Sequence, residues 1–114
     1  MTQTADPTAA DFDALLAVMR RLRDPQAGCP WDLEQTHLSL RNTLVEEAYE
    51  ALEAIDSGET DAMVEELGDL MFQTVFHAQI GADEGRFTIR DVLVRLTEKL
   101  VRRHPHVFAD ATAG

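Results

Sequence analysis

The acidic residues of this chain gather in two short clusters on either side of a tight turn. Glu46, Glu47 and Glu50 precede the turn, and Glu66 and Asp69 follow it. Residues three or four apart are neighbours on a helix, so each cluster sets like charges side by side. Each such pair destabilises the helix by roughly 0.2–0.5 kcal/mol. Two helices that bring both clusters together need a cation between them. Oxygen ligands with no Cys or His beside them favour a hard cation, Mg²⁺ first and Mn²⁺ second.

Helical periodicity recurs along most of the chain and strand-like alternation is missing, which together predict an all-α fold. The predicted helices span about residues 11–23, 37–56, 60–83 and 89–103. The tripeptide Ser-Gly-Glu at 57–59 is a short turn, so the helices on its two sides should run antiparallel. Thr88 and Asp91 have the spacing of a capping box at the start of the last helix, and Pro105 should end that helix.

The third predicted helix is apolar on nearly every side between Leu67 and Ile80. A helix of this kind is usually buried on every side, which in a chain of 114 residues indicates a subunit interface. His77 is interpreted as a core or interface histidine. Asp69 lies inside the apolar stretch, within a turn of Phe72, and an unpaired charge buried there is costly. Asp69 is therefore expected to have a cationic partner rather than a place on a solvated face.

Length and composition restrict the functional classes. A chain of 114 residues suits one domain, 1–114, with residues 1–10 and 109–114 expected to be flexible. A net charge of −11 opposes non-specific nucleic-acid binding, which depends on basic side chains. No apolar run approaches the ~20 residues that span a bilayer, and the polar N-terminus lacks the pattern of a secretory signal. The single cysteine, Cys29, excludes an internal disulfide, so the cytoplasm is the expected compartment.

Spacing alone leaves two interpretations of the acidic clusters open. Charge runs on amphipathic helices are usually solvated faces. Alternatively, Glu47 with Glu50, and Glu66 with Asp69, each project two carboxylates in one direction. Two antiparallel helices would then gather four carboxylates around one or two Mg²⁺ ions, and water activated there would attack a phosphoryl group. A di-iron site would need Glu-x-x-His on two helices, which these clusters lack.

Other candidate ligand-binding residues have ordinary structural alternatives. Lys99, Arg102 and Arg103 would either hold phosphate oxygens or offset the dipole at the end of a helix. Trp31 would either anchor a loop on the hydrophobic core or stack on a nucleobase. Thr43, one turn before the first acidic cluster, would either reach a ligand or fill space.

Six motifs follow one another along the chain. They are Cys29-Pro30-Trp31-Asp32, Gln35-Thr36-His37, Glu46-Glu47-Ala48-Tyr49-Glu50, Glu65-Glu66-Leu67-Gly68-Asp69-Leu70, Phe76-His77-Ala78 and Lys99-Leu100-Val101-Arg102-Arg103-His104-Pro105-His106-Val107-Phe108. Together they resemble the MazG nucleoside triphosphate pyrophosphohydrolases, over nearly the whole chain from about Leu15 to Phe108. The acidic clusters alone are shared with the wider all-α pyrophosphatase superfamily, including dimeric dUTPases.

The resemblance implies an antiparallel four-helix-type bundle that assembles as a homodimer or a higher homo-oligomer. It implies Mg²⁺-dependent hydrolysis of a nucleoside triphosphate between the α and β phosphates, with Mn²⁺ as a substitute, in nucleotide-pool house-cleaning. The familiar bacterial member carries two such modules in tandem, whereas this chain carries one, which looks more like the first. A catalytically weak dimerisation or nucleotide-sensing module is therefore the alternative.

The resemblance also implies roles for individual residues. The implied metal ligands are Glu47, Glu50, Glu66 and Asp69. The implied catalytic residues are Glu46, Glu47 and Glu50, of which Glu46 would be an auxiliary acid that steers the attacking water. The implied substrate contacts are Lys99 and Arg103 to the triphosphate, with Arg102, Trp31 and Thr43 as further candidates. Base and sugar preference, the number of ions and the choice between dimer and tetramer stay open.

Overall fold

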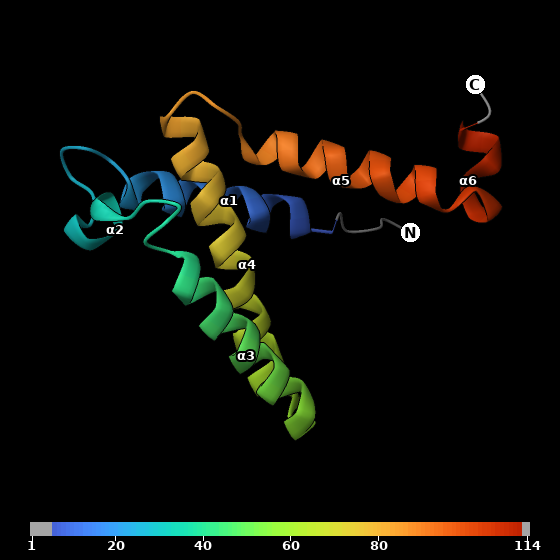
Figure 1. Ribbon diagram of the computed structural model, residues 1–114, viewed down its shortest axis with the longest axis horizontal. Helices are drawn as coiled ribbons and strands as arrows, with labels where there is room; N and C mark the ends of the chain where they lie inside the picture. The colour runs from blue at the N-terminus through green and yellow to red at the C-terminus, as the bar shows by residue number, and fades with distance from the viewer. Residues whose placement is uncertain (1–5, 113–114) are drawn as a thin grey trace, which may run out of the picture.

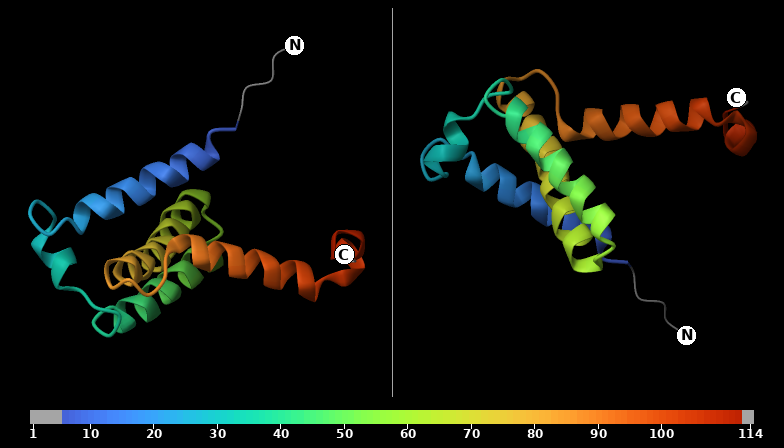
Figure 2. Two further views of the ribbon diagram at one scale, coloured as in Figure 1. Left: turned by 90° about the horizontal axis from the view of Figure 1, so that it is seen from above. Right: turned by 60° about the horizontal axis from the view of Figure 1, so that its bottom comes forward.

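The computed structural model describes residues 6–112, and every regular element among them is a helix. The helices are α1 (Thr8–Leu22), α2 (Pro30–Glu34), α3 (Arg41–Ser57), α4 (Thr60–Asp83), α5 (Ile89–Arg103) and α6 (Pro105–Thr112). Helices α3 and α4 form an antiparallel hairpin, α1 crosses α4, and α5 extends away from the hairpin (Figure 1). The all-α prediction is confirmed for the described residues. Within one chain the long helices do not close into a four-helix bundle, because α5 diverges from α3 (Figure 2).

Local chemistry sets the turns that join the long helices. Gly58 ends α3 with φ of 71°, a left-handed conformation that glycine adopts without steric cost, and its N–H donates to the Ile55 carbonyl at 3.2 Å. The predicted capping box is present at the start of α5. The Thr88 N–H donates to Asp91 Oδ2 at 2.9 Å, and the Asp91 N–H donates to Thr88 Oγ1 at 3.3 Å. These contacts fix where the hairpin turns and where α5 begins.

The long helices differ from the prediction mainly at their first residues. Helix α1 begins at Thr8, three residues earlier than predicted. Helix α3 begins at Arg41, four residues later than predicted. A side-chain turn takes the place of the missing residues: the Thr36 N–H donates to Ser39 Oγ at 2.8 Å, and the Ser39 N–H donates to Thr36 Oγ1 at 3.1 Å. Such bonds compete with the backbone bonds of a helix and delay its start.

Two short helices were not predicted, and both begin with a proline. Pro30 opens α2 and Pro105 opens α6. Proline breaks a helix from inside but fits its first position, where the missing N–H has no intrahelical partner. The prediction that α5 ends before Pro105 is correct, but a further helix follows. Of the ends expected to be flexible, residues 1–5 and 113–114 lie outside the described part, and residues 8–10 and 109–112 are helical.

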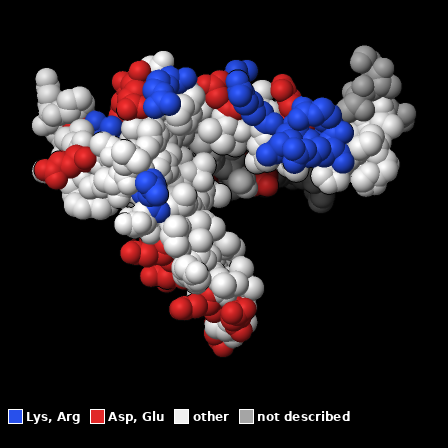
Figure 3. Space-filling model, in the orientation of Figure 1, with Lys and Arg blue, Asp and Glu red and all other residues white. Residues whose placement is uncertain are grey.

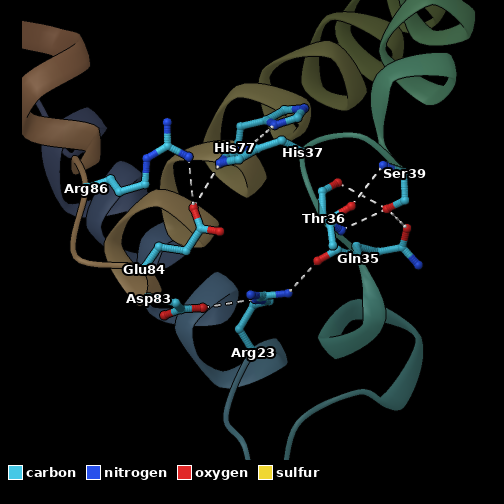
Figure 4. Close-up of polar contacts among 9 residues, drawn as sticks. All are labelled: Arg23, Gln35, Thr36, His37, Ser39, His77, Asp83, Glu84 and Arg86. Carbon is cyan, nitrogen blue, oxygen red and sulfur yellow. Dashed lines mark hydrogen bonds and ion pairs between the residues drawn. The ribbon is translucent and has the colours of Figure 1, made fainter.

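The hydrophobic core lies where α1, the turn before α3 and the second half of α4 meet. Its buried members are Met19, Leu40, Val75, Phe76 and Ile80. Arg23 closes the core on one side. Its guanidinium donates to the Asp32 carbonyl at 2.8 Å. It also donates to the Gln35 carbonyl at 3.1 Å and to the Asp83 carboxylate at 3.0 Å (Figure 4). This side chain therefore holds α2 and the following turn against the end of α4.

Much apolar surface is exposed in the single chain. The exposed apolar residues include Leu44, Val45, Tyr49, Leu52 and Ile55 on α3, Val64, Leu67 and Met71 on α4, and Leu93, Leu96 and Leu100 on α5. Within the single chain α4 is buried only toward its C-terminal end, so the expectation that a subunit interface covers the rest of residues 67–80 stays a prediction. Val75 and Ile80 are buried there, whereas Leu67 is 49% and Met71 53% exposed.

Candidate metal centre

Three carboxylates meet where α3 packs against α4. Oxygens of Glu47, Glu66 and Asp69 all lie within 4.8 Å of one another. The two helices approach through the buried Ala51 and Ala54 of α3, whose small side chains leave space between the backbones. Because the hairpin is antiparallel, the third turn of α4 comes to lie beside the second turn of α3. Spacing within each helix and the pairing of the two helices together build the cluster.

The cluster has acceptors without donors. Glu47 and Glu66 are half-buried, and in each the Oε2 atom is buried with no hydrogen-bond partner among residues 6–112. Burial raises the pKa of Glu47, and the charges of Glu50, Asp69 and Glu46 raise it further. Burial also raises the pKa of Glu66, and the charges of Glu50, Asp69 and Glu47 raise it further. Negative charge is therefore unfavourable here unless a cation compensates it.

The chemistry of these donors fits a hard divalent cation. All three residues offer carboxylate oxygens, the ligand type that Mg²⁺, Mn²⁺ and Ca²⁺ prefer. The two unpartnered Oε2 atoms are the observation that favours such an ion over ordinary solvation, because buried polar atoms are normally hydrogen-bonded. Glu47 lies on α3, and Glu66 and Asp69 lie on α4. The three side chains are therefore attached to rigid helical backbone. The residues present therefore fit a divalent metal.

The other predicted acidic residues lie at the edge of this group. Glu50 is exposed, and its charge is near enough to Glu66 to raise the pKa of that carboxyl group. Glu46 is exposed on α3 beside Glu47. Asp69 differs from the prediction: despite the apolar sequence around it, its side chain is exposed in the single chain. Helices α1 and α5 face the side of α4 that carries Leu70, Met71 and Thr74, and Asp69 is not among the residues on that side.

The structure does not bring the predicted basic residues to the carboxylates within one chain. Lys99, Arg102 and Arg103 lie near the end of α5, and Figure 3 shows the basic residues of α5 apart from the acidic residues of the α3–α4 hairpin. Trp31 lies on α2 with 54% of its surface exposed and its ring edge-on to Phe76, 6.4 Å between centroids. Thr43 is half-buried on α3, one turn before Glu47.

Two polar features of α4 were missed by the sequence analysis. His77, interpreted as a core or interface histidine, pairs with His37: their Nδ1 atoms are 2.7 Å apart, their rings stack, and His37 also contacts Glu84 (Figure 4). Burial, and then the charge of His37, lower the pKa of His77. Gln73 is buried, and because it follows Asp69 by four residues, helical spacing puts it on the same face of α4. No local sequence pattern predicts either feature, because the histidine pair joins residues forty apart in sequence and Gln73 is a single amide residue.

Comparison with known proteins agrees with the geometry. The profile of the MazG nucleotide pyrophosphohydrolase domain matches residues 35–108. An uncharacterized protein of Bacillus subtilis strain 168, YabN, is 57% identical over 100 residues, which cover 88% of this chain and 20% of that protein. The nucleoside triphosphate pyrophosphohydrolase/pyrophosphatase MazG of Thermotoga maritima is 56% identical over 100 residues, 88% of this chain and 39% of that protein.

The nucleoside triphosphate pyrophosphohydrolase of Escherichia coli K12 is 52% identical over 102 residues, 90% of this chain and 39% of that protein. The chain thus spans between 20% and 39% of the length of these three relatives. Among residues 6–112, none of the helices has the length and apolarity needed to cross a membrane. The matched residues include both acidic clusters and all of α3, α4 and α5, and the chain belongs to the MazG nucleotide pyrophosphohydrolase domain family.

Proposed function

We propose that this domain hydrolyses a nucleoside triphosphate between the α and β phosphates, giving a nucleoside monophosphate and pyrophosphate. The convergence of Glu47, Glu66 and Asp69, with two buried oxygens left without partners, carries the proposal. These three residues hold Mg²⁺, with Mn²⁺ as a substitute, and Glu50 completes the set. When bound, the ion neutralises phosphate charge and activates water for attack on phosphorus. The names of the Thermotoga and Escherichia relatives support this reaction.

The protein side chains divide the remaining work. Glu46, exposed beside the cluster, accepts the proton of the attacking water as the new bond to the α phosphorus forms and pyrophosphate leaves. Lys99 and Arg103 bind the phosphate oxygens that carry the developing charge, with Arg102 beside them. Trp31 offers an exposed ring for the base, and Thr43 offers a hydroxyl one turn from Glu47. Such a reaction suits removal of surplus or noncanonical nucleotides in the cytoplasm by a single domain.

The distance between α5 and the carboxylates makes the proposed site a shared one. Lone monomers rarely expose extended apolar patches, and here such side chains occur on α3, α4 and α5. A homodimer that buries these faces would bring α5 of one copy to the α3–α4 hairpin of the other, and would close the four-helix-type bundle that one chain leaves open. The basic residues would then reach the carboxylates across the interface.

Pyrophosphate release from a panel of nucleoside triphosphates, with Mg²⁺ and with Mn²⁺, tests the reaction. Glu50→Gln should abolish turnover while the protein remains folded and of the same size in light scattering. Glu34→Gln, an exposed glutamate on α2 outside the cluster, serves as the matched control and should keep full activity. Release of orthophosphate, or no turnover with either ion, would refute the proposal.

Mixing two inactive variants tests whether the site is shared. Glu50→Gln and Lys99→Met each remove one half of the proposed site. In a two-fold dimer with the halves on different chains, half of all dimers formed from equal amounts contain one chain of each variant, and each of these mixed dimers has one intact site of two. The mixture should therefore regain about a quarter of the wild-type rate. If both halves belong to one chain, no mixed dimer has an intact site and the mixture stays inactive.

The alternative is a dimerisation or nucleotide-sensing module with little catalysis. The separation of the basic residues from the carboxylates in one chain is the observation that favours it. A folded wild-type dimer that binds nucleotide and metal but releases no pyrophosphate would support this alternative.

A further inference from the structure

One buried polar side chain beside the carboxylates has no partner. Gln73 of α4 is only 4% exposed, and its Oε1 atom is buried without a hydrogen bond to any residue that the structure describes. Buried amide oxygens in proteins are nearly always hydrogen-bonded, so each exception calls for a physical reason. Gln73 lies in the middle of α4, where the neighbouring backbone N–H groups already bond within the helix.

Helical spacing places Gln73 on the side of α4 that carries the metal centre. Gln73 follows Asp69 by four residues and Glu66 by seven, so the three lie on one face of α4. Long side chains on a helix lean back toward the N-terminus, which for Gln73 is the direction of Asp69. On the other side, one turn further along, the imidazole of His77 is bonded to His37 at 2.7 Å. Gln73 thus continues the row of carboxylate residues along this face of α4.

The row contains acceptors only. Glu47 Oε2, Glu66 Oε2 and Gln73 Oε1 are all buried and all lack a hydrogen-bond partner. A bare cation would account for the two carboxylates, which carry charge. A neutral amide oxygen one turn away is better matched by a donor, and the water molecules that Mg²⁺ keeps when bound are strong donors.

We propose that Gln73 is a positioning residue of the metal centre, whose amide oxygen accepts a hydrogen bond from the water shell of the divalent cation. This inference rests on the proposed function, because it needs the cation to bind between α3 and α4. Gln73 then orients the shell on the side of Asp69 and limits the cation to one place in the row. Partners of this kind typically change metal affinity 10–100-fold when they are removed.

Gln73→Met is the test, because methionine has nearly the same length and shape but no acceptor oxygen. Affinity for Mn²⁺ alone, measured on the full chain without nucleotide by the paramagnetic resonance of the free ion, should fall about 10–100-fold. With EDTA present the same variant should unfold at a higher temperature than the wild type, because an unpartnered buried oxygen has been removed. Gln79→Met is the matched control: Gln79 lies on the same helix, donates to Asp83 at 2.9 Å, and should leave Mn²⁺ affinity unchanged.

A purely structural role for Gln73 gives the opposite pattern, with a less stable protein in EDTA and unchanged Mn²⁺ affinity, and that result would overturn the inference. If the wild type binds Mn²⁺ and Gln73→Met binds it equally well, the inference fails while the proposed function stands. If the wild type binds no Mn²⁺, both fail. Gln73→Asn, which keeps the amide but withdraws it by one methylene, serves if Gln73→Met does not fold. Its Mn²⁺ affinity should also fall, and an unchanged value would overturn the inference.

Discussion

Replacing Glu47 by glutamine should stabilise the protein when no divalent cation is present. An oxygen of Glu47 lies within 4.8 Å of an oxygen of Asp69. Two like charges at that distance repel by about 3.5 kcal/mol at an effective dielectric constant of 20, and by about 0.9 kcal/mol at that of water. Glu47 is half-buried and Asp69 exposed, so the value lies in the lower part of this range. We expect Glu47→Gln to raise the free energy of unfolding by about 1–2 kcal/mol at neutral pH.

The gain should depend on pH in a definite direction. The pKa of Glu47 is raised above its ordinary 4.5, first by burial and then by the neighbouring carboxylates Glu50, Asp69 and Glu46. The folded protein therefore holds this proton more tightly than the unfolded chain does, so protonation stabilises the wild type below about pH 4.5 and the benefit is lost as pH rises through the folded pKa. The difference in unfolding free energy between Glu47→Gln and the wild type should be largest near pH 7 and should shrink as the pH falls toward about 4.5.

Thermal unfolding in EDTA at both pH values measures this difference. A gain of 1–2 kcal/mol corresponds to a rise in Tm of about 4–10 °C for a domain of this size. Adding Mg²⁺ or Mn²⁺ should reverse the order, because the wild type then gains more from binding. Glu65→Gln, an exposed glutamate of α4 outside the cluster, should change the stability by less than about 0.5 kcal/mol. A variant less stable than the wild type in EDTA at pH 7, or an equal gain at both pH values, would refute the electrostatic reasoning.

Two further predictions concern side chains that join the helices. The side chain of Arg23 is only 11% exposed. Arg23→Met removes its ion pair with Asp83 and its hydrogen bonds to the backbone of α2 and the following turn. Because hydrogen bonds of charged groups contribute about 1.5–3 kcal/mol, the urea midpoint should fall clearly, and an unchanged midpoint would contradict the role assigned to the guanidinium. His77→Phe tests the histidine pair. Burial, followed by the charge of His37, lowers the pKa of His77 below its ordinary 6.5. The unfolded chain therefore binds this proton more tightly, and the wild type should lose stability as pH falls below about 6.5. Phenylalanine keeps the stacking on His37 and removes the titration, so its urea midpoint should depend less on pH between about 8 and 5.5. If the urea midpoints of the wild type and of His77→Phe depend equally on pH, the loss of stability comes from another titrating group.

Local features of the fold could be predicted because they depend on residues close in sequence. The positive φ of Gly58 and the bonds between Thr88 and Asp91 involve one turn of chain, and both follow from residue type and spacing. The helices opened by Pro30 and Pro105 were missed because proline is compatible with both the end of one helix and the start of another. Which of the two occurs depends on whether the following residues find a surface to pack on.

The amino-acid sequence alone determined that this chain is helical and that its glutamates and aspartates lie in pairs on helix faces, since 3.6 residues per turn is a property of the backbone. Only the tertiary structure decided that Glu47, Glu66 and Asp69 meet while Glu50 lies at the edge, and that Gln73 is buried with no partner. It likewise decided that α5 carries its basic residues away from the carboxylates of its own chain. Spacing fixes the face of a helix on which a residue lies, but the rotation and offset between two helices depend on the packing of every side chain between them.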